Sequence, residues 1–234
     1  MILNKKVLII IPAFNEAESI EKVVNNIVND YPQYDYVIVN DGSTDATRKI
    51  CRENNYNMLD LPVNVGLAGA IKSGIKYANY YQYEYVVQID GDGQHDPEYI
   101  ADMLDFMKKH DSDIVIGSRF VDQKKPLTIR MLGSNLISLA IYITTGKKIQ
   151  DVTSGMRLFN KRMIKRFGYQ MNYGPEPDTL AFLINCGVKV DEVRVTMKER
   201  AAGTSYLTVG RSISYMIHMI YGILIFQWFR KKEK

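Results

Sequence analysis

Short apolar runs alternate with amphipathic stretches through the first half of this 234-residue chain, and this alternation constrains the fold most strongly. Four β-rich runs are each bounded by turn or helix signals, at 7–11, 36–39, 85–89 and 114–116. Helical patterns lie between and after them, at 20–28, 44–54, 67–79 and 97–109. Such alternation is typical of buried parallel strands joined by right-handed crossovers. We therefore expect an α/β fold with a mostly parallel sheet flanked by helices.

The composition agrees with one large domain. With 46% apolar residues the chain can bury a sizeable core. Its formal net charge of +4 does not require a nucleic-acid partner, although it suits a phosphate-bearing substrate. Cys51 and Cys186 lie far apart, with no CxxC pair or Cys/His cluster, which is typical of ordinary thiols in a reducing compartment. We expect exposure to the cytosol and no nucleic-acid partner.

A second apolar feature lies near the end of the chain. The segment 213–229 is almost wholly apolar over 17 residues and runs into Arg230, Lys231 and Lys232. This length is at the lower limit for a membrane span. The aromatic residues and the basic flank favour a helix that lies in the membrane interface, and a core or oligomer helix is the alternative. We expect a catalytic domain over 1–210 and a membrane-associating helix over 211–234.

Polar turns follow three of the expected strands. They read PAFNE at 12–16, NDGSTD at 40–45 and DGDGQHDP at 90–97. In doubly wound sheets ligands bind beyond the carboxyl ends of the strands, so these turns are the first place to look for a site. The oxygen-rich turn at 90–97 suits a hard divalent cation that bridges to a diphosphate, and a solvated acidic turn is the alternative. We expect His95 to support this turn and not to be a ligand.

The other turns have structural alternatives as well. Asn15 and Ser43 could cap helices, and Gly42 could simply form a turn. A carboxylate such as Asp41 could instead accept hydrogen bonds from a nucleobase or ribose. The motif NVGLAGA at 64–70 begins a helix whose free amides could face phosphate, or it could serve tight packing.

The ordered set of motifs resembles family 2 glycosyltransferases of the GT-A fold. The chain adds GSR at 117–119, DVTSGMRLF at 151–159 and a late RxxGxS from Arg200 to Ser205. With these it is similar to the polyprenyl-phosphate branch, typified by dolichyl-phosphate mannose synthase. The resemblance runs from about Val7 to Ser205. The chain departs from this branch at Phe14, where Tyr is common, and at Tyr206, where Lys commonly follows the Ser.

The resemblance implies an activity, a cofactor and a set of site residues. The activity is inverting transfer of a sugar from a UDP- or GDP-sugar to a polyprenyl phosphate of the undecaprenyl or dolichyl type, with Mg²⁺ or Mn²⁺. The implied nucleotide-sugar-binding residues are Pro12, Phe14, Glu16, Val39, Asp41, Asp90, Gly91, Arg119 and Arg200. The implied metal site comprises Asp90, Asp92 and Gln94. Asp92 and Asp151 are the implied catalytic residues, with Asp151 near the reacting centre.

The acceptor determines whether a general base is needed. A phosphate monoester has a second pKa of about 6, so its oxygen is already anionic near neutral pH. Catalysis then depends on positioning and electrostatics, and Arg130, Arg157 and Ser205 are candidates to contact the acceptor. A hydroxyl of a growing polysaccharide would need a carboxylate base, for which Glu176 and Asp178 are the candidates. A non-catalytic nucleotide-sugar-binding subunit is the third alternative.

The resemblance also leads to expectations about location and partners. The protein is expected at the cytoplasmic face of the membrane, peripheral or short-anchored. Many bacterial relatives carry a pair of clear membrane spans that this sequence does not show. We therefore expect a small membrane-protein partner or a homo-oligomer.

Overall fold

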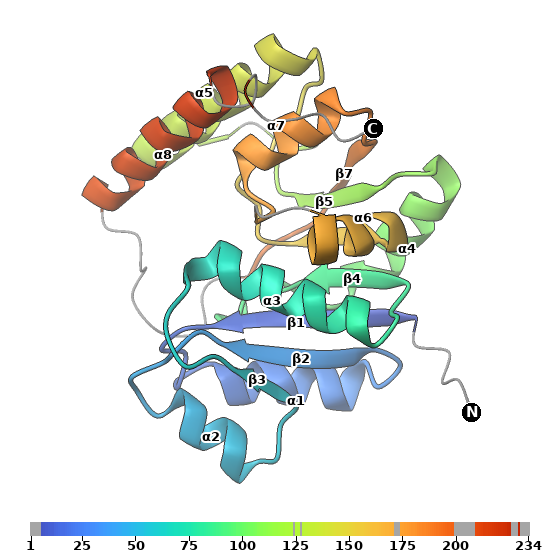
Figure 1. Ribbon diagram of the computed structural model, residues 1–234, viewed down its shortest axis with the longest axis vertical. Coiled ribbons are helices and arrows are strands. Elements are labelled where there is room, and N and C mark those ends of the chain that lie inside the picture. The colour runs from blue at the N-terminus through green and yellow to red at the C-terminus, as the bar shows by residue number, and fades with distance from the viewer. Residues whose placement is uncertain are drawn as a thin grey trace.

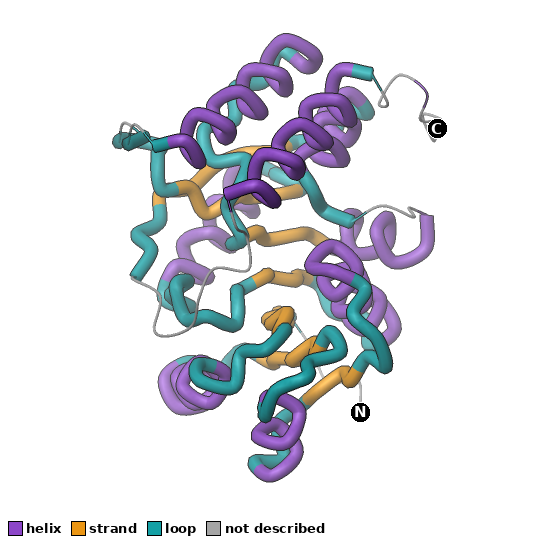
Figure 2. The backbone as a smooth tube through the Cα atoms, turned by 90° about the vertical axis from the view of Figure 1, so that its left-hand side faces the viewer, coloured by secondary structure: helices purple, strands orange, loops and turns teal. Residues whose placement is uncertain are grey.

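The computed structural model describes residues 6–123, 125–126, 128–170, 174–198, 209–225 and 229. A seven-stranded sheet runs through the molecule, with helices packed on both of its faces (Figure 1; Figure 2). The strand order is β3-β2-β1-β4-β6-β5-β7. This arrangement confirms the α/β fold expected from the alternating pattern.

The elements have the following bounds. The strands are β1 (Val7–Ala13), β2 (Asp35–Asn40), β3 (Met58–Asp60), β4 (Tyr85–Gln88), β5 (Ile114–Ser118), β6 (Arg157–Asn160) and β7 (Val190–Arg194). The helices of the first half are α1 (Ile20–Asp30), α2 (Thr47–Glu53), α3 (Gly66–Tyr80) and α4 (Tyr99–His110). The second half has α5 (Ile129–Thr145), α6 (Lys161–Lys165), the π-helix η1 (Arg166–Gln170), α7 (Pro177–Asn185) and α8 (Val209–Leu224).

The interior strand β1 contributes to both hydrophobic cores. Successive side chains of a strand point to opposite faces, so Leu8 and Ile10 enter one core while Ile9 and Ile11 enter the other. The first core also takes side chains from α3, α5, α6, α7 and α8. The second is closed mainly by α1 and α4, and it includes the free thiol of Cys51. A strand buried on both faces explains the continuous apolar run at 7–11.

The sheet is mostly parallel, with one antiparallel strand. Parallel pairing joins β1 to β2 and β4, β2 to β3, and β5 to β7. The strand β6 lies between β4 and β5 and runs antiparallel to both. The sequence pattern indicated neither β3, whose three residues are too short to show a period, nor β6, which begins within the DVTSGMRLF motif.

The helix α8 packs along α5 and α7 (Figure 1). Its Met219 and Ile223 are buried in the first core. On α5, Gly133 permits this close packing, because an added Cβ would lie only 1.4 Å from the sulfur of Met216. One face of α8 is thus part of the first hydrophobic core. Among the described residues, no helix combines the length and apolar character needed to cross a bilayer.

Candidate active site

The predicted turns meet at one edge of the sheet. Because β1 pairs with both β2 and β4 in parallel, the carboxyl ends of all three strands lie at this edge. Ala13 lies opposite Asn40, and the carbonyl of Ala13 accepts a hydrogen bond from the Asp41 amide at 2.9 Å. The expectation that PAFNE, NDGSTD and DGDGQHDP lie at the same edge of the sheet is therefore confirmed.

Asn15 joins the first two turns. It has a left-handed backbone, with φ of 58°, which asparagine tolerates better than most residues. Its backbone amide donates to Ser43 Oγ at 3.0 Å, and its side-chain Oδ1 accepts from the backbone amide of Thr44 at 2.8 Å. The helix-cap alternative is wrong for both Asn15 and Ser43, since the N-cap residues of α1 and α2 are Ser19 and Ala46.

The second turn packs closely on the start of α3. Gly42 has φ of 67°, and an added Cβ would lie 2.6 Å from the backbone nitrogen of Asn64. The neighbouring Asp41 is buried, and its Oδ1 accepts from the amide of Val65 at 2.7 Å. One carboxylate oxygen of Asp41 thus holds the NVGLAGA segment in place. Val39 is buried in the strand below.

The acidic turn lies against the PAFNE turn. An added Cβ on Gly91 would lie 3.2 Å from the carbonyl oxygen of Pro12 and 3.5 Å from Cγ of Glu16. Asp92 is buried, and its Oδ1 accepts from the amide of Gln94 at 3.0 Å. The geometry thus brings predicted nucleotide-binding and metal-binding residues into contact.

His95 supports the acidic turn. Its Nδ1 lies 3.1 Å from the amide nitrogen of Asp90, which donates to it. A ring nitrogen that accepts a hydrogen bond carries no proton, so this contact favours the neutral tautomer with the proton on Nε2. Gln88 Nε2 donates to Asp90 Oδ1 at 3.3 Å. These contacts agree with the expected supporting role of His95.

The acidic turn fits a divalent cation. Asp90 and Asp92 provide two carboxylates on one short turn, the hard oxygen ligands that Mg²⁺ and Mn²⁺ prefer. In the described ranges, no group of three or more His, Cys, Asp or Glu side chains could hold an ion by itself. Proteins commonly hold Mg²⁺ through one or two carboxylates, with water at the other positions.

Gly155 makes room for one of these carboxylates. An added Cβ at this position would lie 2.3 Å from Asp90 Oδ2. The loop that begins at Asp151 therefore packs directly on the acidic turn. Sequence reasoning missed Gly155 as a site residue, although it lies within the DVTSGMRLF motif.

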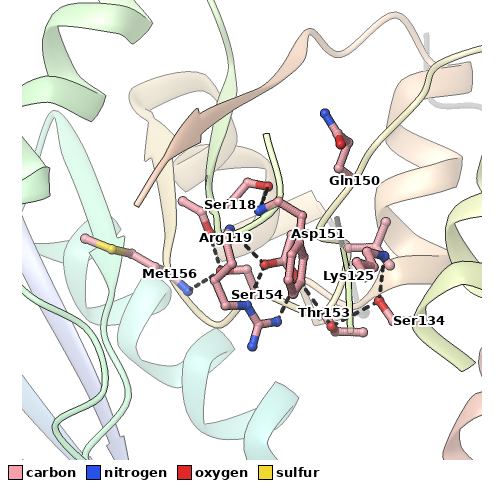
Figure 3. Close-up of polar contacts among 12 residues, drawn as sticks. Ser118, Arg119, Lys125, Ser134, Gln150, Asp151, Thr153, Ser154 and Met156 are labelled. Carbon is pink, nitrogen blue, oxygen red and sulfur yellow. Dashed lines mark hydrogen bonds and ion pairs between the residues drawn. The ribbon is translucent and has the colours of Figure 1, made fainter. Parts of the chain in front are cut away.

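A buried ion pair lies at the start of the same loop (Figure 3). Asp151 is completely buried and accepts from Arg119 Nε at 2.7 Å and from Nη2 at 2.8 Å. Its backbone amide donates to Glu192 Oε1 at 2.7 Å. A bidentate pair fixes the plane of the guanidinium group. Asp151 thus orients Arg119, whose side chain is still 25% exposed.

Two of the predicted acceptor or base residues are directed into the protein. Arg157 is buried, and its three nitrogens donate to the carbonyls of Ser154, Pro175 and Val152. This use of the guanidinium counts against Arg157 as an acceptor contact. Asp178 is buried at the start of α7 beneath α8, where an added Cβ on Gly222 would lie 3.0 Å from its Cβ. Because α8 covers Asp178, its carboxylate is poorly placed to act as a general base.

The other predicted residues are described less fully. Glu176 immediately precedes α7 and is partly buried. Burial raises the pKa of Tyr215 on α8, and the negative charges of Glu176 and Asp178 raise it further. Arg130 belongs to α5, but its side chain is not described, and Arg200 and Ser205 lie outside the described residues.

Solved structures share this fold. The glucosyl-3-phosphoglycerate synthase of Mycobacterium tuberculosis, solved with Mn²⁺, UDP and phosphoglyceric acid, superposes with a TM-score of 0.65. The match covers 94% of this chain and 79% of that chain at 16% sequence identity. At this identity the comparison establishes the GT-A fold alone.

Sequence relatives establish the family. The chain is 30% identical to the UDP-N-acetylglucosamine–dolichyl-phosphate N-acetylglucosaminyltransferase of Methanococcus voltae, over 93% of this chain and 96% of that protein. It is 29% identical to the undecaprenyl-phosphate mannosyltransferase of Micrococcus luteus, over 88% of each. The family model described as "Glycosyl transferase family 2" matches residues 8–168. The chain therefore belongs to glycosyl transferase family 2.

Proposed function

We propose that this glycosyltransferase moves a sugar from a UDP- or GDP-sugar to a polyprenyl phosphate, with inversion at the anomeric carbon. The observation that carries the proposal is the buried Arg119–Asp151 pair, which begins the loop that packs on the Asp90–Asp92 turn. A cation-binding turn for a diphosphate and an oriented guanidinium for a phosphate thus lie at one sheet edge. The name of the Methanococcus voltae relative contains a UDP-sugar and a polyprenyl phosphate, and that of the Micrococcus luteus relative contains a polyprenyl phosphate.

The site residues have separate tasks in the proposed reaction. Asp90 and Asp92 would hold Mg²⁺ or Mn²⁺, which when bound stabilises negative charge on the departing diphosphate. The PAFNE and NDGSTD turns would hold the nucleoside, and Asp41 would keep the start of α3 against it. Arg119, oriented by Asp151, would contact a phosphate group.

The buried position of Asp178 counts against one of the two candidate bases for a hydroxyl acceptor, and leaves Glu176 as the other. A hydroxyl must lose its proton as the bond forms, so a carboxylate must reach it. Asp178 lies beneath α8, away from solvent. A phosphate monoester needs no such group, because its second ionisation, with a pKa of about 6, is largely complete at neutral pH.

An apolar surface on α5 and α8 supports a position at the membrane. Large apolar side chains on these two adjacent helices are at least 41% exposed: Leu132, Leu136, Leu139, Tyr142, Ile143, Ile217, Tyr221 and Leu224. No Asp, Glu, Lys or Arg occurs at 131–146 or 212–225, while Lys147 and Lys148 follow α5. An apolar face with a basic margin suits an anionic bilayer surface. We propose peripheral binding through this surface, called here the α5–α8 face.

Sugar transfer to undecaprenyl phosphate tests the function. The full-length chain would be assayed in detergent with UDP-glucose, UDP-N-acetylglucosamine and GDP-mannose, each with Mg²⁺ or Mn²⁺. We expect a lipid-linked sugar from at least one donor, and loss of the product with Asp92→Asn or a chelator. The exposed Asp105→Asn on α4 is the matched control and should retain activity. If nucleotide binds but no donor yields a lipid product, the acceptor assignment fails.

A further inference from the structure

A half-buried lysine lies at the same edge as the Arg119–Asp151 pair but belongs to none of the motifs. Lys125 lies between β5 and α5, and its Nζ donates to Ser134 Oγ on α5 at 3.1 Å (Figure 3). This nitrogen lies 5.6 Å from the centre of the Phe120 ring. The guanidinium carbon of Arg119 lies 5.0 Å from the centre of the same ring. Two cationic groups are thus placed around one aromatic side chain.

The carboxylates near Lys125 are already used by other groups. Asp151 accepts two side-chain hydrogen bonds from Arg119. Glu192 accepts from the backbone amides of Gln150 and Asp151, both at 2.7 Å. Within the described part of the chain, no carboxylate oxygen lies within the 4.0 Å of an ion pair with Lys125 Nζ. The ammonium group therefore has a neutral hydroxyl as its near partner.

A cation in this position favours an anionic ligand. Burial lowers the pKa of Lys125, whereas the negative charges of Asp151 and Glu192 act in the opposite direction. Removing a charge from water costs free energy unless an opposite charge compensates for it. A phosphate bound beside Lys125 would supply that compensation and would also accept a charge-assisted hydrogen bond.

We propose that Lys125 binds the phosphate group of the lipid acceptor, next to Arg119. The inference rests on the proposed function and adds a residue to its acceptor site. Ser134, which accepts from Lys125, lies on α5, the helix that carries five of the eight apolar residues of the α5–α8 face. A lipid whose chain lies along that face would thus have its phosphate close to Lys125 and the Arg119–Asp151 pair.

Three variants of Lys125 separate a phosphate contact from a structural one. Lys125→Met removes the charge, Lys125→Gln keeps a hydrogen-bond donor without the charge, and Lys125→Arg keeps the charge. The control is Lys22→Met, at an exposed lysine on α1. The measurement is the affinity of the full chain for farnesyl phosphate, a short polyprenyl monophosphate, by titration calorimetry, together with the KM of the nucleotide sugar.

We expect Lys125→Met and Lys125→Gln to weaken binding of farnesyl phosphate by about 10- to 100-fold, the usual effect of losing a hydrogen bond to a charged group. Lys125→Arg should restore most of the affinity. The KM of the nucleotide sugar and the Tm should stay close to the wild-type values, as should the affinity, KM and Tm of Lys22→Met.

Two results would overturn the assignment of Lys125. One is an unchanged affinity for farnesyl phosphate in Lys125→Gln. The other is an equal loss of donor and acceptor binding with a lower Tm in all three variants, because Lys125 would then only hold its loop. If the wild type itself binds no farnesyl phosphate, the proposed function fails, and the inference fails with it.

Discussion

At the scale of single residues, an absent side chain is as important to the site as the charged ones. Asp90 can occupy its position because Gly155 has no Cβ, which would lie 2.3 Å from Oδ2. The contact joins the acidic turn to the loop that also begins with Asp151. A methyl group at position 155 would therefore disturb both the acidic turn and the loop that begins at Asp151, which the proposed reaction requires.

Gly155→Ala should weaken the binding of the divalent cation while leaving the fold intact. The added methyl group would displace the Asp90 carboxylate, and such changes near a metal ligand typically cost about 10- to 100-fold in metal affinity or activity. We expect the Mn²⁺ concentration for half-maximal transfer to rise by about this factor. The control is Gly146→Ala, where the space is open but φ is 71°, so that stability should fall instead. An unchanged Mn²⁺ requirement in Gly155→Ala would contradict this role.

Asp151→Asn should lower activity and stability together. The substitution removes the charge of a buried carboxylate and disturbs a bidentate pair with Arg119. We expect the free energy of unfolding to fall by about 1–3 kcal/mol, measured by denaturant titration. The control is Asp122→Asn, in an exposed pair with Arg194, with an expected change below about 0.5 kcal/mol. Equal effects of the two substitutions would show that the buried pair has no special role.

The sequence predicted the position of the site better than the use of each residue. The acidic turn, PAFNE and NDGSTD were placed together because parallel strands end at one sheet edge. The helix-cap alternative for Asn15 was wrong, because its side chain instead bonds to a turn that is distant in the sequence. Arg157 and Asp178 were selected for their charge, but burial depends on packing by distant segments that a local pattern does not contain.

At the scale of elements, the predicted positions of strands and helices were most accurate where an apolar run or an amphipathic pattern marks the segment. The strands β1, β2, β4 and β5 and the helices α1, α2, α3 and α4 lie close to their predicted ranges. The strands β3 and β6 were missed, since their short runs take their stability from neighbours in the sheet. The apolar segment 213–229 overlaps α8, but α8 begins earlier, at Val209.

Charged substitutions on the α5–α8 face should weaken membrane binding. Leu136→Glu combined with Ile217→Glu places two carboxylates on exposed positions of adjacent helices. Each buried apolar side chain contributes about 1.5–3 kcal/mol, so we expect vesicle binding to fall by at least about 10-fold. The fraction of protein that floats with vesicles of anionic and neutral phospholipids measures this loss of binding.

The control for that experiment is Val28→Glu, at an exposed position on α1, near the opposite end of the molecule (Figure 1). It should not change vesicle binding. If the double substitution instead converts a dimer to a monomer without affecting flotation, the α5–α8 face is an interface between two copies of the chain.

At the scale of the whole molecule, the sheet divides the proposed tasks between its two halves. The carboxyl ends of β1, β2 and β4 carry the turns for the nucleotide and the cation. The loop after β5 carries Arg119 and leads to α5, whose outer side is apolar. The loop between Asp151 and β6 joins the halves by packing on Asp90. A donor from the aqueous phase and an acceptor from a bilayer could thus meet at one edge.

The central claim is that the acceptor group is a phosphate, and a competition between two lipids tests it most directly. The full-length chain would receive equal amounts of undecaprenyl phosphate and undecaprenol in vesicles, with the donor that supports turnover. Mass spectrometry would identify the lipid that carries the sugar. We predict that the phosphate lipid alone is glycosylated. Equal or preferential transfer to undecaprenol would contradict the claim.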